Sequence, residues 1–183
     1  MTLPIEIEIW QGEIAELEVD ALVIPSNESL FMTAPVAASV KRHAVEDVEK
    51  EAVAQGPVKA GSAVVTGGGR LAAPYIIHAV AVGHDLHHDR RRLRKAVESA
   101  LKAAKHLSLR TIAISTLGVE RGVFPASEAA EIMLGAILEH VEQDPGTLET
   151  VVVAVTRSEE RTDYIHALER VAARAAAVPA ESA

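Results

Sequence analysis

Two segments of the chain combine the residue types and the spacing that suit binding of an anion. Asn27 follows a short apolar strand pattern, and a helical pattern begins a few residues later, at Val36. The second segment, STLGVERGVFP at residues 115–125, follows another strand pattern and places Gly118 and Gly122 before a helix. Glycine allows positive φ and close approach of backbone amides to an anion, and free N–H groups at a helix N-terminus attract negative charge. The two segments therefore predict a site for an anionic, phosphate-bearing ligand.

Each feature of these segments also has a structural explanation. A turn between a strand and a helix often contains glycine for backbone reasons alone, and Asn27 could merely turn the chain. Its position at a strand end before a loop nevertheless favours a functional role. A third turn, Gln11-Gly12-Glu13-Ile14, also follows a strand and could meet the other two segments at one edge of the sheet. Ligands of open α/β sheets bind at that edge, beyond the carboxyl ends of the strands.

The hydropathy pattern alternates strands with helices along the chain. The predicted strands cover residues 5–9, 21–24, 62–66, 75–82, 111–115 and 151–155; the predicted helices cover 36–54, 93–106 and 129–141, and a last helix begins at Ser158. Ser127 is a candidate cap for the third helix. Residues 67–69, GGG, are a turn rather than a phosphate loop, because a strand follows them. Strands that alternate with helices predict a three-layer α/β/α sandwich.

Composition excludes several classes of protein. A chain of 183 residues, 49% of them hydrophobic, fits a single domain, which we predict at residues 1–175 with a frayed tail at 176–183. The net charge of −8 and the aromatic content of 3% disfavour nucleic acid as a partner. The absence of cysteine rules out disulfides, thiol catalysis and thiolate metal sites. No apolar run is long enough to span a membrane, and the N-terminus is unlike a signal peptide, so we expect a cytoplasmic protein.

Three groups of titratable residues have structural explanations that we favour. His78 lies inside an apolar strand and is expected to be a core histidine with satisfied polar atoms. The run HDLHHD at residues 84–89 lacks a second, distant cluster of ligands, so we predict no metal site. The basic run at residues 90–95 is expected to be a solvated helix start. Acids of a partner or of a second subunit are the alternative for this run, and a homo-oligomer therefore stays open.

Four short motifs occur in a fixed order along nearly the whole chain. They are Gly12-Glu13-Ile14; Asp20-Ala21-Leu22-Val23 with Asn27; GSAVVT at 61–66 with Gly69, Leu71 and IHAV at 77–80; and the segment 115–125. In this order they resemble the macro domains, a family that binds ADP-ribose. In that family the first motif is Gly-Asp-Ile, the second is Asp-Ala-Ile-Val-Asn-Ala-Ala-Asn, and the fourth is a glycine loop. The resemblance implies the macro fold, a sandwich with a central mixed, mostly parallel sheet.

The resemblance also implies a role for each matching residue. Glu13 would accept a hydrogen bond from the adenine amino group, beside the backbone N–H of Ile14. Asn27 would bind the terminal ribose, and the segment around Ala34 and Val36 would line the distal ribose and the diphosphate. Main-chain amides of the second loop would wrap the diphosphate. The residues of that loop implied to bind the ligand are Ser115, Thr116, Gly118, Val119, Arg121, Gly122 and Phe124, the last against a ribose.

The chain departs from the family pattern at positions that matter for chemistry. Ala37 stands where hydrolytic members carry an Asp, which argues against catalysis, and Ile24 replaces an Asn. Pro35 has no N–H to offer a phosphate, and Glu120 places a carboxylate beside the expected diphosphate, next to Arg121. We therefore predict a module that binds an ADP-ribose-like small molecule or an ADP-ribosylated protein, with no catalytic residue and no cofactor. The alternatives are a hydrolase of ADP-ribosyl or O-acyl-ADP-ribose substrates and a scaffold that has lost the ligand.

Overall fold

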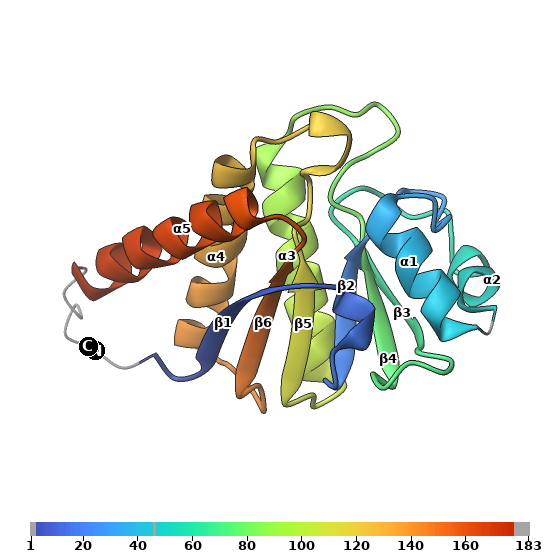
Figure 1. Ribbon diagram of the computed structural model, residues 1–183, viewed down its shortest axis with the longest axis horizontal. Coiled ribbons are helices and arrows are strands. Elements are labelled where there is room, and N and C mark those ends of the chain that lie inside the picture. The colour runs from blue at the N-terminus through green and yellow to red at the C-terminus, as the bar shows by residue number, and fades with distance from the viewer. Residues whose placement is uncertain (1–2, 46, 178–183) are drawn as a thin grey trace.

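The strands form one six-stranded sheet that helices cover on both faces (Figure 1). The computed structural model describes residues 3–45 and 47–177. The strands are β1 (Glu6–Gln11), β2 (Ala21–Pro25), β3 (Ala63–Gly67), β4 (Tyr75–Ala79), β5 (Thr111–Ser115) and β6 (Thr150–Val155). Their order across the sheet is β1-β6-β5-β2-β4-β3, and every neighbouring pair is parallel except β3 with β4. The predicted sandwich with a mixed, mostly parallel sheet is confirmed.

The helices divide between the two faces of the sheet. They are η1 (Ile14–Glu16), α1 (Pro35–Ala44), α2 (Val48–Val53), α3 (Arg90–His106), η2 (Glu120–Gly122), α4 (Ala126–Gln143) and α5 (Ser158–Ala177). Successive side chains of a strand point to opposite faces, so Val23 enters a core shared with α3, α4 and α5. Leu22 enters the other core, which α1 and η1 cover. Strand β2 is buried along its whole length for this reason.

Asp20 fixes the register between the two strands that carry the predicted loops. Its carboxylate accepts the backbone N–H of Arg110 at 2.7 Å and of Thr111 at 2.8 Å, and its own N–H donates to Thr111 Oγ1 at 3.0 Å. Strands β4, β2 and β5 are neighbours that run in the same direction. The loops that follow them therefore lie at the same edge of the sheet (Figure 1).

The helix predicted at residues 36–54 is two helices, α1 and α2. Val45 ends the first one with a left-handed φ of 61°. The Asp47 side chain then accepts the N–H of Lys50 at 3.2 Å and caps the second helix. A β-branched residue rarely adopts positive φ, and the apolar spacing continues through the break. The periodicity of the sequence could not show it.

Other element ends differ from the prediction by a few residues. Pro125 occupies the N-cap position of α4 and Ser127 lies in its first turn, so the predicted Ser127 cap is wrong. Strand β4 ends at Ala79 instead of continuing to residue 82. Helix α5 extends to Ala177, into the predicted tail, and residues 178–183 of that tail lie outside the described residues. In the described part of the chain, no helix is both long and apolar enough to cross a membrane.

The basic run at residues 90–95 forms the first turns of α3 and is paired with acids of the same chain. Asp89 caps the helix, since its carboxylate accepts the N–H of Arg91 at 2.9 Å and of Arg92 at 3.3 Å. The ion pairs of the run in the described part of the chain are Arg90–Glu128, Arg92–Asp85, Arg92–Asp89, Arg94–Glu98 and Arg94–Glu139. Acids near a helix N-terminus offset the unfavourable interaction of these cations with the helix dipole.

Candidate ligand-binding site

A cavity of about 370 Å³ opens at the sheet edge where β2, β4 and β5 end. Three loops form its wall. Its lining residues are Ser26, Asn27, Ser29, Phe31, Thr33, Ala34 and Pro35 after β2; Val82, Gly83, His84 and Leu86 after β4; and Glu120 and Arg121 after β5. This is the place at which open α/β sheets bind ligands.

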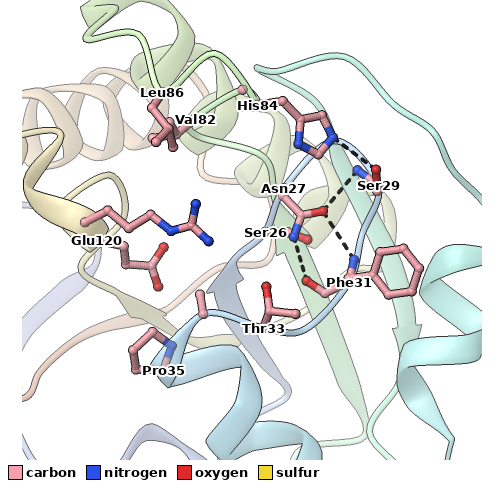
Figure 2. A pocket seen from close by; sticks show the side chains of 13 residues that line it. Ser26, Asn27, Ser29, Phe31, Thr33, Pro35, Val82, His84, Leu86 and Glu120 are labelled. Carbon is pink, nitrogen blue, oxygen red and sulfur yellow. Dashed lines mark hydrogen bonds between the residues drawn. The ribbon is translucent and has the colours of Figure 1, made fainter.

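Asn27 organises the wall that follows β2. Its amide Nδ2 donates to the carbonyl of Phe31 at 2.7 Å, and its Oδ1 accepts the N–H of Ser29 at 3.0 Å and of Phe31 at 3.3 Å (Figure 2). These bonds use both acceptor positions of Oδ1 and one of its two amide hydrogens. Asn27 therefore turns the chain, as the structural explanation expected, and keeps one N–H for a ligand.

Helix α1 begins at this wall with Pro35, which has no N–H. The first helical hydrogen bond runs from the N–H of Ala38 to the carbonyl of Ala34 at 2.8 Å. The amides of Val36 and Ala37 precede it, so they have no partner within the helix. The Ala37 side chain is buried in the core beneath α1. The start of α1 can offer amides to an anion, and it carries no carboxylate.

The wall that follows β5 is built from residues with left-handed backbone. Gly118, Arg121 and Gly122 have φ of 82°, 56° and 68°. The loop closes with a hydrogen bond from the N–H of Phe124 to the carbonyl of Gly118, at 3.1 Å. The Phe124 ring is buried in the core and lies against His88, with the ring centroids 4.2 Å apart. The loop therefore turns its backbone sharply and holds its aromatic residue away from the cavity lining.

Glu120 projects from this second wall into the cavity, across from Asn27 and His84 (Figure 2). The residue is half-buried, and its Oε1 atom is shielded from solvent and has no hydrogen-bond partner among the described residues. Burial raises the pKa of Glu120 from 4.5 to about 7, although the neighbouring charge of Arg121 lowers it. Ser26 Oγ, on the opposite wall, is likewise buried without a partner in the described part of the chain. Both residues line the cavity, and each keeps one polar atom without a hydrogen-bond partner among the described residues.

The third wall, after β4, was not predicted to belong to the site. Glu28 holds it in place, because its Oε2 accepts the N–H of His84 at 2.9 Å. Ser29 Oγ lies 3.0 Å from Nε2 of the same histidine. Within residues 3–45 and 47–177, no three His, Cys, Asp or Glu side chains are grouped so that they could hold a metal ion. In the sequence, only the position of His84 after a strand could have indicated this wall, because that strand, β4, runs parallel to β2.

The cavity, its place in the sheet and the two loops allow a comparison with known proteins. The macro domain family model matches residues 23–133. The chain belongs to the macro domain family. A protein of Mycobacterium tuberculosis is 32% identical over 82% of this chain and 41% of its own length. The mouse ADP-ribose glycohydrolase MACROD1 is 30% identical over 87% of this chain and 50% of its own. This macro domain chain therefore spans half or less of these two relatives.

The solved structures agree with the assignment to the macro domains. The Trypanosoma brucei macrodomain, whose crystal structure is in complex with ADP-ribose, superposes with a TM-score of 0.81 at 25% identity. The match covers 87% of this chain and 67% of that one. The macro domain of ganglioside induced differentiation associated protein 2 superposes with the same TM-score at 26% identity, over 91% of this chain and 84% of that one.

In this macro domain, Asn27, Ala34 and Arg121 are the predicted ligand residues that line the cavity. The other predicted residues lie outside its lining: Glu13, Ile14, Val36, Ser115, Thr116, Gly118, Val119, Gly122 and Phe124. Several of these are core residues; Ile14, for example, packs beneath α1. Glu13 follows the edge strand β1, which β6 and β5 separate from β2. The lining residues that the sequence did not predict include Ser26, Ser29, Phe31, Thr33, Val82, Gly83, His84 and Leu86.

His78 of this macro domain is a core residue, as predicted, but only one of its ring nitrogens is satisfied. Nε2 lies 2.9 Å from Thr66 Oγ1, while Nδ1 has no partner within the described residues. Burial lowers the pKa of His78 from 6.5 to about 4, so the ring is neutral at physiological pH. It does not line the cavity, and its role is structural.

Proposed function

We propose that this macro domain binds ADP-ribose, or a group that contains it, in the cavity between the loops that follow β2, β4 and β5. The ligand is either a free small molecule or the modification carried by an ADP-ribosylated protein. The observation that carries the proposal is one cavity lined from facing walls by Ser26 and Glu120, each of which keeps a buried polar atom without a hydrogen-bond partner among the described residues. A volume of about 370 Å³ lies in the range of small-molecule sites.

The groups around the cavity suit the chemistry of a ribose joined to a diphosphate. Ribose hydroxyls donate and accept hydrogen bonds, so they can satisfy Ser26 Oγ and the remaining N–H of Asn27. A diphosphate needs N–H donors, and we assign this role to the amides of Val36 and Ala37, which have no partner within α1 and follow directly after the lining residues Ala34 and Pro35. Arg121 adds a positive charge on the facing wall. We place the distal ribose and the diphosphate here, with adenine directed toward Glu13 and Ile14, as the family resemblance implies.

Isothermal titration calorimetry with ADP-ribose tests the proposal. We expect saturable heat and a rise in Tm, with weaker binding of AMP, which lacks the distal ribose and one phosphate. Thr33 is exposed and lines the cavity, so Thr33→Trp should fill the site and abolish binding. Thr162→Trp, at an exposed position on α5, is the matched control and should bind as the wild type does. Neither heat nor a thermal shift at millimolar ADP-ribose would mean that the proposal is wrong.

A second candidate function is hydrolysis of an ADP-ribose derivative, and the position of Glu120 favours it. A general acid or base works best with a pKa near the working pH, and the pKa of this cavity-lining carboxyl is about 7. The similarity to mouse ADP-ribose glycohydrolase MACROD1 supports the same candidate. An ADP-ribosylated protein incubated with the wild type should release ADP-ribose above a heat-killed control. Glu120→Gln should abolish that release, and equal release by both proteins would remove Glu120 from the reaction.

A further inference from the structure

Glu120 creates a conflict in a site that receives a diphosphate. A charged carboxylate that faces an anion repels it, and the partly water-free cavity wall strengthens the repulsion. The Oε1 atom has no hydrogen-bond partner among the described residues that could hold it as an anion. A protonated carboxyl has the opposite property, because its O–H donates a hydrogen bond to a phosphate oxygen.

We propose that Glu120 binds the ligand's phosphate as a neutral carboxylic acid, so that each ligand molecule brings one proton into the complex. This inference rests on the proposed function. It adds the charge state of Glu120 in which the site accepts the ligand. The proton is taken from solvent when Glu120 is ionised in the free protein, and no covalent bond changes. Glu120 thereby becomes a residue that determines specificity, since the acid form favours a phosphate and the carboxylate form disfavours it.

The charged and titratable groups that line the cavity with Glu120 are Arg121 and His84. Arg121 is the residue whose charge acts on the Glu120 carboxyl, and it lowers the pKa of that group without reversing the effect of burial. His84 is the other of these side chains, and its Nε2 lies 3.0 Å from Ser29 Oγ. A test must therefore separate Glu120 from His84.

The experiment measures ADP-ribose binding by calorimetry from pH 5 to pH 9, in pairs of buffers with different ionisation enthalpies. The diphosphate of ADP-ribose stays fully ionised over this range, so any proton exchange belongs to the protein. Because the pKa of Glu120 in the free protein is about 7, proton uptake should be close to zero at pH 5 and close to one per ligand at pH 8. The affinity should fall by about tenfold for each pH unit above pH 7.

Two variants assign the proton. Glu120→Gln keeps a donor without a titratable group, so we expect it to match the wild type at pH 5 and to hold that affinity at pH 8.5 without buffer-dependent heat. His84→Gln should show the same fall of affinity with pH as the wild type. The inference is overturned if binding by the wild type takes up no proton or releases one. It is also overturned if the affinity of Glu120→Gln falls with pH as that of the wild type does. Absence of binding by the wild type and by Glu120→Gln at every pH would instead show that the proposed function itself fails.

Discussion

The loop after β2, residues 26–35, and the loop after β5, residues 116–125, form facing walls of the same cavity but use their polar side chains differently. In the first loop the Asn27 side chain makes three hydrogen bonds to the backbone of its own loop. In the second loop the Glu120 carboxyl points into the cavity and leaves Oε1 without a partner in the described part of the chain. The first wall is a scaffold that shapes the site, and the second supplies a group whose bonding is completed by a ligand.

Local backbone explains the difference between the walls. An asparagine can accept from N–H groups two and four residues on, and this folds residues 27–31 into a compact turn. The second loop instead turns at three left-handed positions, of which only Gly118 and Gly122 are glycine. The remaining one, Arg121, follows Glu120 directly. The first loop has one such position, Leu30 with a φ of 62°, and is held mainly by the hydrogen bonds of Asn27, whereas the second is held chiefly by its backbone conformation.

The largest effect should come from a substitution at the base of the second wall. A Cβ on Gly118 would lie 3.0 Å from Phe124 Cδ2 and 3.3 Å from the Leu93 side chain, at a φ of 82°. Left-handed strain and overpacking together should make Gly118→Ala lower the free energy of unfolding by about 3 kcal/mol. A Cβ on Gly122 would meet no atom of the described residues within 4 Å, so Gly122→Ala should cost only about 1 kcal/mol. Urea denaturation measures both, and equal costs would contradict this account of the loop.

The next effect is the pH dependence that Glu120 gives to stability. Its folded pKa of about 7 lies above its ordinary value of 4.5, so its stabilising contribution is complete below pH 4.5 and is lost as pH rises through 7. The full shift corresponds to about 3 kcal/mol, and partial exposure of the side chain reduces the expected effect to about 2 kcal/mol.

Glu120→Gln removes that titration. The stability of this variant relative to the wild type should therefore rise by about 2 kcal/mol between pH 4.5 and pH 8.5. Urea denaturation of both proteins at each pH gives this difference, from which His78 and the other shared groups cancel. A difference that stays constant with pH would show that the Glu120 carboxyl is already solvated in the free protein.

A smaller effect is expected in the first wall. Asn27→Ala removes three hydrogen bonds of the loop, which should lower the free energy of unfolding by about 1–2 kcal/mol. Thr33→Ala is the control in the same loop, because the Thr33 hydroxyl makes no hydrogen bond with any described residue, and it should change stability by less than about 0.5 kcal/mol. Chemical denaturation compares the two. Similar values would mean that Asn27 does not organise this wall.

Most of the fold follows from local sequence patterns. Alternating apolar residues mark β1, and the β-branched run of β6 marks a strand that is buried between two others. The ordered motifs then identify the family, because each sits at a strand end or a turn that the fold requires. The break between α1 and α2 could not be predicted, since it depends on the left-handed backbone of Val45, which the sequence disfavours.

The candidate site was predictable only in part. Asn27 and Arg121 were expected, and both line the cavity. The loop after β4 was not predicted, because its His and Asp residues suggest metal ligands and nothing in their spacing indicates a cavity wall. Glu120 was recognised as a departure from the family pattern, but its burial depends on the path of the backbone around Arg121. The sequence identifies Glu120 as unusual, and only the fold shows that its carboxyl is partly buried.

The smallest effect on stability is expected from a substitution of Ser26. This substitution also tests the comparison between the two walls. Ser26 lines the cavity, and its hydroxyl is shielded from solvent and has no partner among the described residues, so Ser26→Ala should change the free energy of unfolding by less than about 0.5 kcal/mol. The same change should weaken ADP-ribose binding by about 1 kcal/mol, or roughly fivefold, because the ligand loses a hydrogen bond. Ser39 is the matched control: its hydroxyl is also buried without a partner in the described part of the chain, but it lies within α1 and outside the cavity lining. Ser39→Ala should leave the affinity unchanged, as calorimetry can show. If both variants bind as the wild type does, the unpartnered hydroxyl of the first wall is a packing feature, and the ligand is held by the second wall alone.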